Sequence, residues 1–441
     1  MIQQVDPYIL IMAASVIIIL SFFFGEVAKR TNVPSVLMLI ILGILIKIGL
    51  DATGLGNLDF FPVLQILGIV GLIMIVLEAA LELKLERDKF LSIGKALAIA
   101  AIGLMASTWV AAIILHRFIP GMSMNIAWLY ATPLSILSSA IIIPSVTGLR
   151  GAKREFHIYE STFSDILGIM LFYFLASQIP LPIGPEEEGL DVVEHHASGA
   201  AYLLNILITI GASVIASYGI VLIFQNIKSH VKLFLLIAVL LLLYSLGKTA
   251  HLSSLIVILT FGLIIANMRL FFRGPLKKWL NFKKAMHIYE GLHVVTVETA
   301  FVVRTFFFVI FGITISLASL FSVEVATVSV LIILSIYLIR FVILRLFIGS
   351  DILPQLFVAP RGLITILLFY AIPQEIQVEG FEPGVLLFII IGTSLIMTLA
   401  MVADKKRSTA ATRKVSDNPV GYERWKAPTL SEAALEDNGG H

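Results

Sequence analysis

Long runs of apolar residues recur along the whole chain, each close to the length of one membrane crossing. A transmembrane helix needs about 20 consecutive apolar residues to span the hydrocarbon core, and hydropathy windows of similar length give thirteen such segments. They lie at 8–25, 35–50, 62–82, 92–116, 126–147, 157–179, 202–224, 232–247, 253–270, 292–317, 323–347, 354–373 and 384–403. The pattern predicts an all-α polytopic membrane protein with about thirteen transmembrane helices.

Composition supports this interpretation and excludes other classes of protein. Hydrophobic residues make up 59% of the 441 residues and charged residues only 14%, whereas a soluble protein carries roughly 25% charged residues. The mean hydropathy of +0.99 leaves no room for a large soluble domain. A net charge of +2 argues against a nucleic-acid partner, and the absence of cysteine excludes disulfides and thiolate chemistry.

The connections between the apolar segments alternate in charge. Lys and Arg collect in cytoplasmic loops, so the alternation places the N-terminus outside and the C-terminus in the cytoplasm. We expect a bacterial inner membrane as the location, because the tail is short and targeting signals are absent. The stretch 271–286 is basic and aromatic, which predicts an amphipathic helix at the cytoplasmic interface. Basic connections contain Lys29, Lys84, Arg150, Lys228, Arg273 and Lys405, and acidic ones contain Asp51, Glu186 and Glu375.

Thirteen helices divide into six, one linker and six, so that the second six enter the membrane with reversed polarity, as in inverted-repeat transporters. Prolines, serines and glycine interrupt equivalent segments of the two halves. The fifth reads ATPLSILSSAIIIPSV and the twelfth reads PQLFVAPRGLITILLF. We expect two discontinuous helices whose freed backbone groups form a site near the bilayer midplane; the alternative is that the prolines only kink the helices.

The sixth segment carries two carboxylates, Glu160 and Asp165, at membrane depth. Each such charge costs at least ~2.5 kcal/mol by insertion scales, so its presence indicates a function. At about 100° per residue, Glu160 shares a face with Ser164, and Asp165 shares the adjacent face with Ser161. A carboxylate beside hydroxyls can hold a hard monovalent cation or accept a proton instead. This competition is the chemistry of an antiporter.

Glu160 requires a buried basic partner, for which Arg340, Arg361 and Arg304 are candidates. A carboxylate paired with arginine stays ionised, so Glu160 would be structural and Asp165 would exchange the proton. A single exchanging carboxylate predicts electroneutral transport. The alternative is that salt bridges fix both acids and nothing is transported.

Three further residues suggest secondary roles. Glu78, in the third segment, is a possible partner for Arg304. Glu155 and His157, at the cytoplasmic start of the sixth segment, are candidates for a pH sensor.

Three short motifs resemble those of the monovalent cation–proton antiporter superfamily. Residues 160–165 (ESTFSD) resemble the ESLLND signature of its sodium–proton exchanger branch, and residues 138–141 (SSAI) resemble the SSTAI string of its potassium-efflux branch. Pro360-Arg361-Gly362 resembles the arginine–glycine motif of the second discontinuous helix. The resemblance spans residues 8–403 by topology, and the order of the motifs is more specific than any one of them.

The resemblance implies that Asp165 binds the ion with help from Ser161, Ser138 and Ser139, that Ser164 replaces a supporting asparagine, and that Glu160 pairs with Arg340. It also implies a homodimer in the lipid bilayer with no cofactor besides the transported Na⁺, Li⁺ or K⁺ and H⁺. A core domain (91–180 and 319–403) would move against a dimerisation domain (1–90, and 181–318 with the linker helix). We expect residues 404–441 to form a disordered cytoplasmic tail.

Ser164 and the missing Thr-Asp-Pro motif are departures from the exchanger branch, and they leave the cation open. We expect a secondary transporter that exchanges protons for Na⁺ by alternating access. The alternatives are a K⁺/H⁺ antiporter, a K⁺ efflux system, or a cation channel of similar architecture. An enzyme is not expected, because the sequence contains no HExxH motif, no paired catalytic aspartates and no nucleophile motif.

Overall fold

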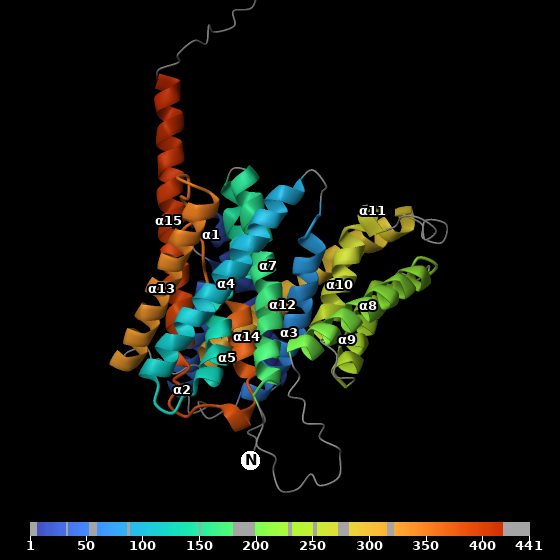
Figure 1. Ribbon diagram of the computed structural model, residues 1–441, viewed down its shortest axis with the longest axis horizontal. Coiled ribbons are helices and arrows are strands. Elements are labelled where there is room, and N and C mark those ends of the chain that lie inside the picture. Colours follow the sequence, from blue (N-terminus) through green and yellow to red (C-terminus); the bar gives the residue numbers. More distant parts are fainter. Residues whose placement is uncertain are drawn as a thin grey trace, which may run out of the picture.

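The computed structural model of the chain describes residues 7–31, 34–52, 60–85, 89–149, 151–179, 199–227, 232–249, 254–271, 282–314 and 322–417. Within these ranges the chain forms α-helices joined by turns and short 3₁₀ segments, without any β-strand (Figure 1). The helices are α1 (Pro7–Thr31), α2 (Ser35–Ala52), α3 (Phe61–Glu82), α4 (Phe90–Phe118), α5 (Met124–Ser135), α6 (Ser139–Ser145), α7 (Gly151–Ser177), α8 (Gly199–Phe224), α9 (Lys232–Thr249), α10 (Ser254–Ala266), α11 (Met268–Phe271), α12 (Phe282–Thr314), α13 (Val323–Phe347), α14 (Leu363–Tyr370) and α15 (Gly384–Asp417).

Each apolar segment predicted from the sequence contains α-helix in the structure. Ten helical stretches among the described residues are long and apolar enough to cross a membrane, and two shorter apolar stretches lie at Leu233–Leu246 and Leu255–Ala266. In hydrocarbon every backbone N–H and C=O must find a partner within the protein, and a helix satisfies most of them internally. The protein is therefore an all-helical, multi-pass membrane protein, as predicted.

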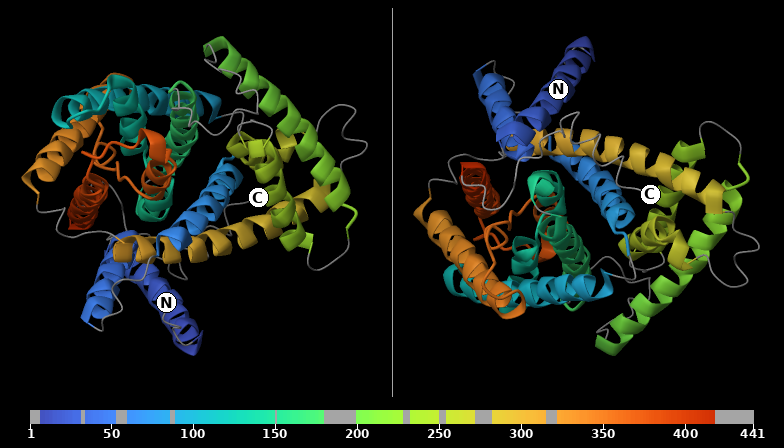
Figure 2. Two further views of the ribbon diagram at one scale, coloured as in Figure 1. Left: turned by 90° about the horizontal axis from the view of Figure 1, so that it is seen from below. Right: turned by 90° about the horizontal axis from the view of Figure 1, so that it is seen from above.

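The helices pack in two groups. In one, α4 packs against α5, α7 and α13, and α13 packs against α15; in the other, α12 packs along α2 and α3, and α10 packs against α3, α8 and α9. Figure 2 shows the first group as a compact bundle around α14, with α3 and the long α12 between it and α8–α10. The predicted ion-site residues all lie in the first group.

Glycines allow α2 and α12 to approach closely. A Cβ atom at Gly43 would collide with the carbonyl of Val309, and one at Gly312 would collide with the carbonyl of Ile40. Small residues at such crossings permit backbone contact, which is how transmembrane helices gain packing energy without a hydrophobic driving force. The backbones of α2 and α12 are therefore in close contact, and this pair is a tightly packed part of the second group.

Both predicted helix interruptions are present, and they touch each other. The first separates α5 from α6 at residues 136–138, and the second is an extended stretch, residues 358–362, that leads into α14. The backbone N–H of Ser138 donates to the carbonyl of Pro360 at 3.0 Å. A Cβ atom at Gly362 would collide with the Ser138 hydroxyl, so only glycine allows this contact. The two breaks thus cross beside α7.

Two segments differ from the prediction in how far their helices extend. The twelfth segment is helical only from Leu363 to Tyr370, and turns occupy residues 353–357; Pro360 has no N–H and disfavours helix at the residue before it. In contrast, α15 continues to Asp417 and projects beyond its neighbours, so residues 404–417 are not a disordered tail (Figure 1). This stretch is polar, but it contains helix-favouring Ala, Lys and Arg without Gly or Pro. Most of the predicted interfacial helix at 271–286 and the tail beyond 417 lie outside the described residues.

Candidate ion-binding site

The middle of α7 presents an unusually polar buried surface. Glu160, Ser161, Ser164 and Asp165 are all buried, and the two carboxylate residues are only 1% and 2% exposed. A buried charge is costly unless it is paired, hydrogen-bonded or bound to an ion. The surroundings of each carboxylate therefore indicate its role.

Both carboxylate oxygens of Glu160 accept hydrogen bonds from Arg340 of α13. The guanidinium donates through Nη1 to Oε1 at 2.7 Å and through Nη2 to Oε2 at 2.8 Å. Its Nε donates to the carbonyl of Gln355 at 3.0 Å. This two-pronged geometry is the strongest form of ion pair between side chains. The structure brings together the two residues that the sequence placed in one structural pair.

His157 belongs to the same cluster and does not lie at an entrance with Glu155. Its Nδ1 is 3.5 Å from Glu160 Oε2, and the side chain is completely buried. Glu155 instead pairs with Lys89, whose Nζ lies 2.9 Å from its Oε1. The predicted pH-sensing pair is therefore split between two environments. The spacing of three residues between His157 and Glu160 was the signal available in the sequence.

Asp165 has a different environment, because it lacks a basic partner among the described residues. The hydroxyl and backbone N–H of Ser139, the first residue of α6, face its carboxylate. Neither carboxylate oxygen, however, completes a hydrogen bond of good geometry with a described residue. A carboxylate buried in this way can accept a proton or a cation.

Thr162 is a residue that the sequence analysis missed. Its side chain is fully buried, and its hydroxyl has no hydrogen-bond partner among the described residues. Side chains on a helix tilt toward its N-terminus, so the Asp165 carboxylate lies over the turn that contains Ser161 and Thr162. No motif singled out Thr162; the signal is its position three residues before Asp165.

The remaining predicted serines bind backbone groups of their surroundings. Ser161 Oγ donates to the carbonyl of His157 at 2.7 Å, and Ser164 Oγ accepts the N–H of Leu137 at 3.0 Å. Ser138 contributes its N–H to the crossing with Pro360. Of the four serines proposed around Asp165, Ser139 is the one that faces the carboxylate, while Ser164 and Ser138 hold the break in place.

Arg361 is not part of the Glu160 pair, which corrects the prediction. Its Nε donates to the carbonyl of Leu134 at 2.8 Å and its Nη1 to the carbonyl of Ala359 at 3.3 Å. Leu134 lies in the last turn of α5, where carbonyls lack intrahelical donors. Arg361 is 2% exposed, and its guanidinium donates hydrogen bonds to carbonyls that would otherwise lack a donor, so it stabilises the crossing of the two breaks.

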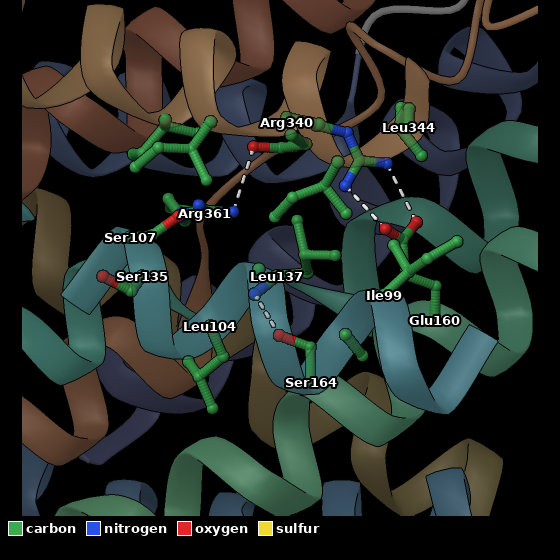
Figure 3. Close-up of a pocket in the computed structure, with 16 residues that line it drawn as sticks. Ile99, Leu104, Ser107, Ser135, Leu137, Glu160, Ser164, Arg340, Leu344 and Arg361 are labelled. Atoms are coloured by element: carbon green, nitrogen blue, oxygen red, sulfur yellow. Dashed lines mark hydrogen bonds and ion pairs between the residues drawn. The ribbon is translucent and has the colours of Figure 1, made fainter. Parts of the chain in front are cut away.

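A small cavity lies beside this arrangement, on the Glu160 side of α7. Figure 3 shows Arg340, Arg361, Glu160 and Ser164 around it, with Ser107 of α4 and Ser135 of α5. Asp165 is not among its lining residues. The two carboxylates of α7 therefore face separate environments, as their helical positions predicted.

The second predicted pair joins α3 to α12. Arg304 Nη2 lies 3.1 Å from Glu78 Oε2 and 3.3 Å from Glu78 Oε1. Arg304 also donates through Nη1 to the carbonyl of Ala140 in α6, at 3.3 Å. Both side chains of the pair are 17% exposed. Arg304 thus links the second helix group to the half-helix that carries Ser139.

Comparisons with known proteins identify the family and the fold of the chain. Residues 15–403 match the family described as "Sodium/hydrogen exchanger, transmembrane". Two structures of the sodium proton antiporter MjNhaP1 from Methanocaldococcus jannaschii are similar in fold. One, at pH 8, has a TM-score of 0.61 at 18% identity and covers 90% of this chain and 99% of that chain. The other has a TM-score of 0.62 at 17% identity and covers 96% and 100%.

The search of curated proteins gives no match. The family match nevertheless extends over most of the chain, and it confirms the resemblance that the motifs around Asp165 indicated. The protein is therefore a member of the sodium/hydrogen exchanger family, a family of membrane transporters and not of enzymes.

Proposed function

We propose that the protein is a secondary active transporter that exchanges H⁺ for Na⁺, one for one, at Asp165. The observation that supports this most directly is the contrast between the two buried carboxylates. Both oxygens of Glu160 accept hydrogen bonds from Arg340, whereas Asp165 has no basic partner among the described residues and faces the hydroxyl and N–H of Ser139 without a hydrogen bond of good geometry. Proton and cation would therefore compete for the same two oxygens.

The ion would be held by the Asp165 carboxylate together with the hydroxyls of Ser139 and Thr162. Hard cations such as Na⁺ prefer oxygen ligands of this kind. When the cation binds, the proton leaves, so the site carries the same charge in both loaded states. Exchange through one carboxylate is then electroneutral and insensitive to the membrane potential.

The proposed transport cycle moves one helix group against the other. α4–α7 and α13–α15 would form the moving core, and α1–α3 with α8–α12 the dimerisation domain of a homodimer. The packing supports this division. Helices within each group pack densely against one another, whereas α3 contacts the core only sparsely, mainly at α14 and α7. Thirteen crossings in two inverted repeats, with the N-terminus outside, complete the proposed topology.

K⁺ is the alternative cation, and the Ser138–Ser139 string is the specific feature that favours it. A site of hydroxyls and one carboxylate accepts either ion, and the distances between the ligand oxygens decide between them. A channel of the same architecture would use Asp165 as a fixed selectivity charge and would move ions without protons.

The test uses purified protein in liposomes with a pH gradient and a lumenal pH dye. Na⁺, Li⁺ and K⁺ are added in turn, with and without a clamped membrane potential. We expect Na⁺ to dissipate the gradient equally in both conditions, and Asp165→Asn to abolish the response. Asp351→Asn is the matched control, because this carboxylate is 76% exposed. Normal exchange in Asp165→Asn would contradict the assignment, and cation flux without proton movement would favour the channel.

A further inference from the structure

The half-helix α6 contains a proline that leaves one backbone carbonyl without its helical donor. In an α-helix the carbonyl of Ala140 would accept the N–H of residue 144, but residue 144 is proline and has no N–H. The guanidinium of Arg304 takes this position, since its Nη1 donates to the Ala140 carbonyl at 3.3 Å. A side chain from α12 thus replaces a hydrogen bond that the sequence of α6 cannot make.

Arg304 is itself held in place by α3. Both oxygens of Glu78 accept from its Nη2, at 3.1 and 3.3 Å. Arg304 lies within the apolar stretch Lys284–Thr314, where an unpaired charge would be costly. Glu78 compensates this charge and orients the guanidinium, so that Nη1 is free to reach α6.

The carbonyl bound by Arg304 is adjacent to the candidate ion site. Ala140 follows Ser139, whose hydroxyl and N–H face the Asp165 carboxylate. α6 has only seven residues, and so short a helix depends on its neighbours for its position. Holding the Ala140 carbonyl therefore fixes the placement of the residue before it.

We propose that Arg304 is a positioning residue for ion binding, which holds Ser139 against Asp165 by donating to the Ala140 carbonyl that Pro144 leaves free. The proposal rests on the proposed function of Asp165. Because the contact joins the two helix groups, it also ties cation affinity to the arrangement of those groups. If Arg304 served only to neutralise the charge of Glu78, the effect of its substitution on cation binding would not depend on whether residue 144 is proline.

A double-mutant cycle separates these roles. Arg304→Lys keeps the positive charge beside Glu78 but removes the second donor that reaches α6. We expect it to raise the KM for Na⁺ by about three- to tenfold, the effect of one lost hydrogen bond, with kcat changed by less than about twofold. Pro144→Ala introduces the missing N–H, so in that background the same Arg304→Lys substitution should change KM by less than about twofold.

Pro133→Ala is the matched control for the cycle. Pro133 lies in α5 and its substitution adds an N–H that points toward residue 129, not toward Ala140. The KM increase caused by Arg304→Lys should therefore persist in full in the Pro133→Ala background. Glu78→Gln, which loosens the guanidinium, should raise KM in the same direction as Arg304→Lys. Thermal unfolding and gel filtration confirm that each variant is folded.

The experiment distinguishes a failure of the positioning role of Arg304 from a failure of the proposed exchange function. If the unmodified protein shows no cation-dependent proton flux, both proposals are overturned. If it exchanges normally and Arg304→Lys leaves KM unchanged, only the positioning role is overturned. An equal rise of KM in the Pro144→Ala, Pro133→Ala and unmodified backgrounds would also overturn it, because Arg304 would then act through its charge alone.

Discussion

At the scale of single residues, the two carboxylates of α7 differ in how much stability depends on them. Glu160 and Arg340 are both buried and make two short hydrogen bonds. Breaking such a pair leaves an uncompensated charge in a nonpolar interior and costs about 3–5 kcal/mol. Asp165 has no such partner in the part of the chain that the structure describes, so its neutralisation should affect transport far more than folding.

Glu160→Gln should therefore lower the unfolding temperature of the purified protein substantially, as measured by intrinsic fluorescence on heating in detergent. Asp351→Asn provides the control, since it breaks an exposed pair with Lys153 that contributes only about 0–1 kcal/mol. Combining Glu160→Gln with Arg340→Leu should cost less than the sum of the single changes. Equal unfolding temperatures for Glu160→Gln and Asp351→Asn would contradict a structural role for this pair.

Substitution of Thr162 should have the opposite effect to substitution of Glu160, because it should lower the affinity for Na⁺ without lowering the stability of the protein. Its hydroxyl makes no hydrogen bond to a described residue, so Thr162→Val removes a potential ligand without breaking a bond within the protein. We expect the KM for Na⁺ to rise about three- to tenfold at an unchanged unfolding temperature, and Thr162→Ser to retain most of the affinity. Liposome exchange assays at varied Na⁺ measure this.

Thr296→Val in α12 is the matched control for Thr162. Thr296 is equally buried and its hydroxyl also lacks a partner among the described residues, but it lies on a helix outside the proposed core. Its substitution should leave KM for Na⁺ unchanged. If both valine variants raise KM equally, buried hydroxyls act on transport indirectly and Thr162 is not a ligand.

The sequence could predict which side chains carry charge into the membrane, but not all of their partners. Arg340 was a candidate for Glu160 because its segment and the family motif both favoured it. Arg361 was equally plausible by charge, yet it binds the carbonyls of Leu134 and Ala359. Those carbonyls become available only where the two breaks cross. Partner choice of this kind depends on tertiary contacts that spacing along one helix does not contain.

At the scale of elements, the crossing of the two breaks depends on one glycine. A Cβ atom at Gly362 would collide with Ser138 Oγ and would approach Ser138 Cβ to 2.9 Å. Ser138 cannot withdraw easily, because its N–H is bound to Pro360. Gly362→Ala should therefore separate α6 from the start of α14, abolish exchange in liposomes and lower the unfolding temperature.

Gly94→Ala in α4 is the comparison for Gly362→Ala. Apart from the nearby backbone of α4 itself, no atom of a described residue lies within 4 Å of a Cβ atom added at Gly94, and alanine in a helix is more favourable than glycine by up to about 1 kcal/mol. This variant should transport normally and be at least as stable as the unmodified protein. Normal exchange in Gly362→Ala would mean that the crossing tolerates separation, and the breaks would then not form the ion site.

Helix existence followed from the sequence because the bilayer leaves few alternatives for a long apolar segment. Helix extent did not follow as well. Hydropathy ended α15 near residue 403, whereas local helix propensity carries it to Asp417. In the twelfth segment the break at Pro360 was predicted, but the residues before it form turns and not a half-helix, and Pro360 and the contact with Ser138 keep residues 358–362 extended. Hydropathy reports the environment of a segment, and local residue chemistry sets its ends.

At the scale of the whole molecule, the proposed cycle requires the two helix groups to slide past each other. α3 and α14 meet where a Cβ atom at Gly68 would lie 2.8 Å from Leu367 Cδ2. α3 and α12, in contrast, belong to the same group, and a Cβ atom at Gly71 would lie 3.2 Å from Val303 Cγ1. The chain contains no cysteine, so introduced cysteine pairs can join either contact without a competing thiol.

A disulfide or a short bifunctional thiol reagent between Gly68→Cys and Leu367→Cys should stop exchange, because it ties α3 to α14 across the proposed sliding surface. Reduction should restore exchange after disulfide formation. The pair Gly71→Cys and Val303→Cys cross-links two helices of one group, so it should leave exchange unaffected at the same cross-linking yield, measured by gel shift after proteolysis between the two cysteines. Undiminished exchange with the first pair fully cross-linked would exclude relative motion at this contact, and inhibition by both pairs would indicate that α3 itself deforms during transport.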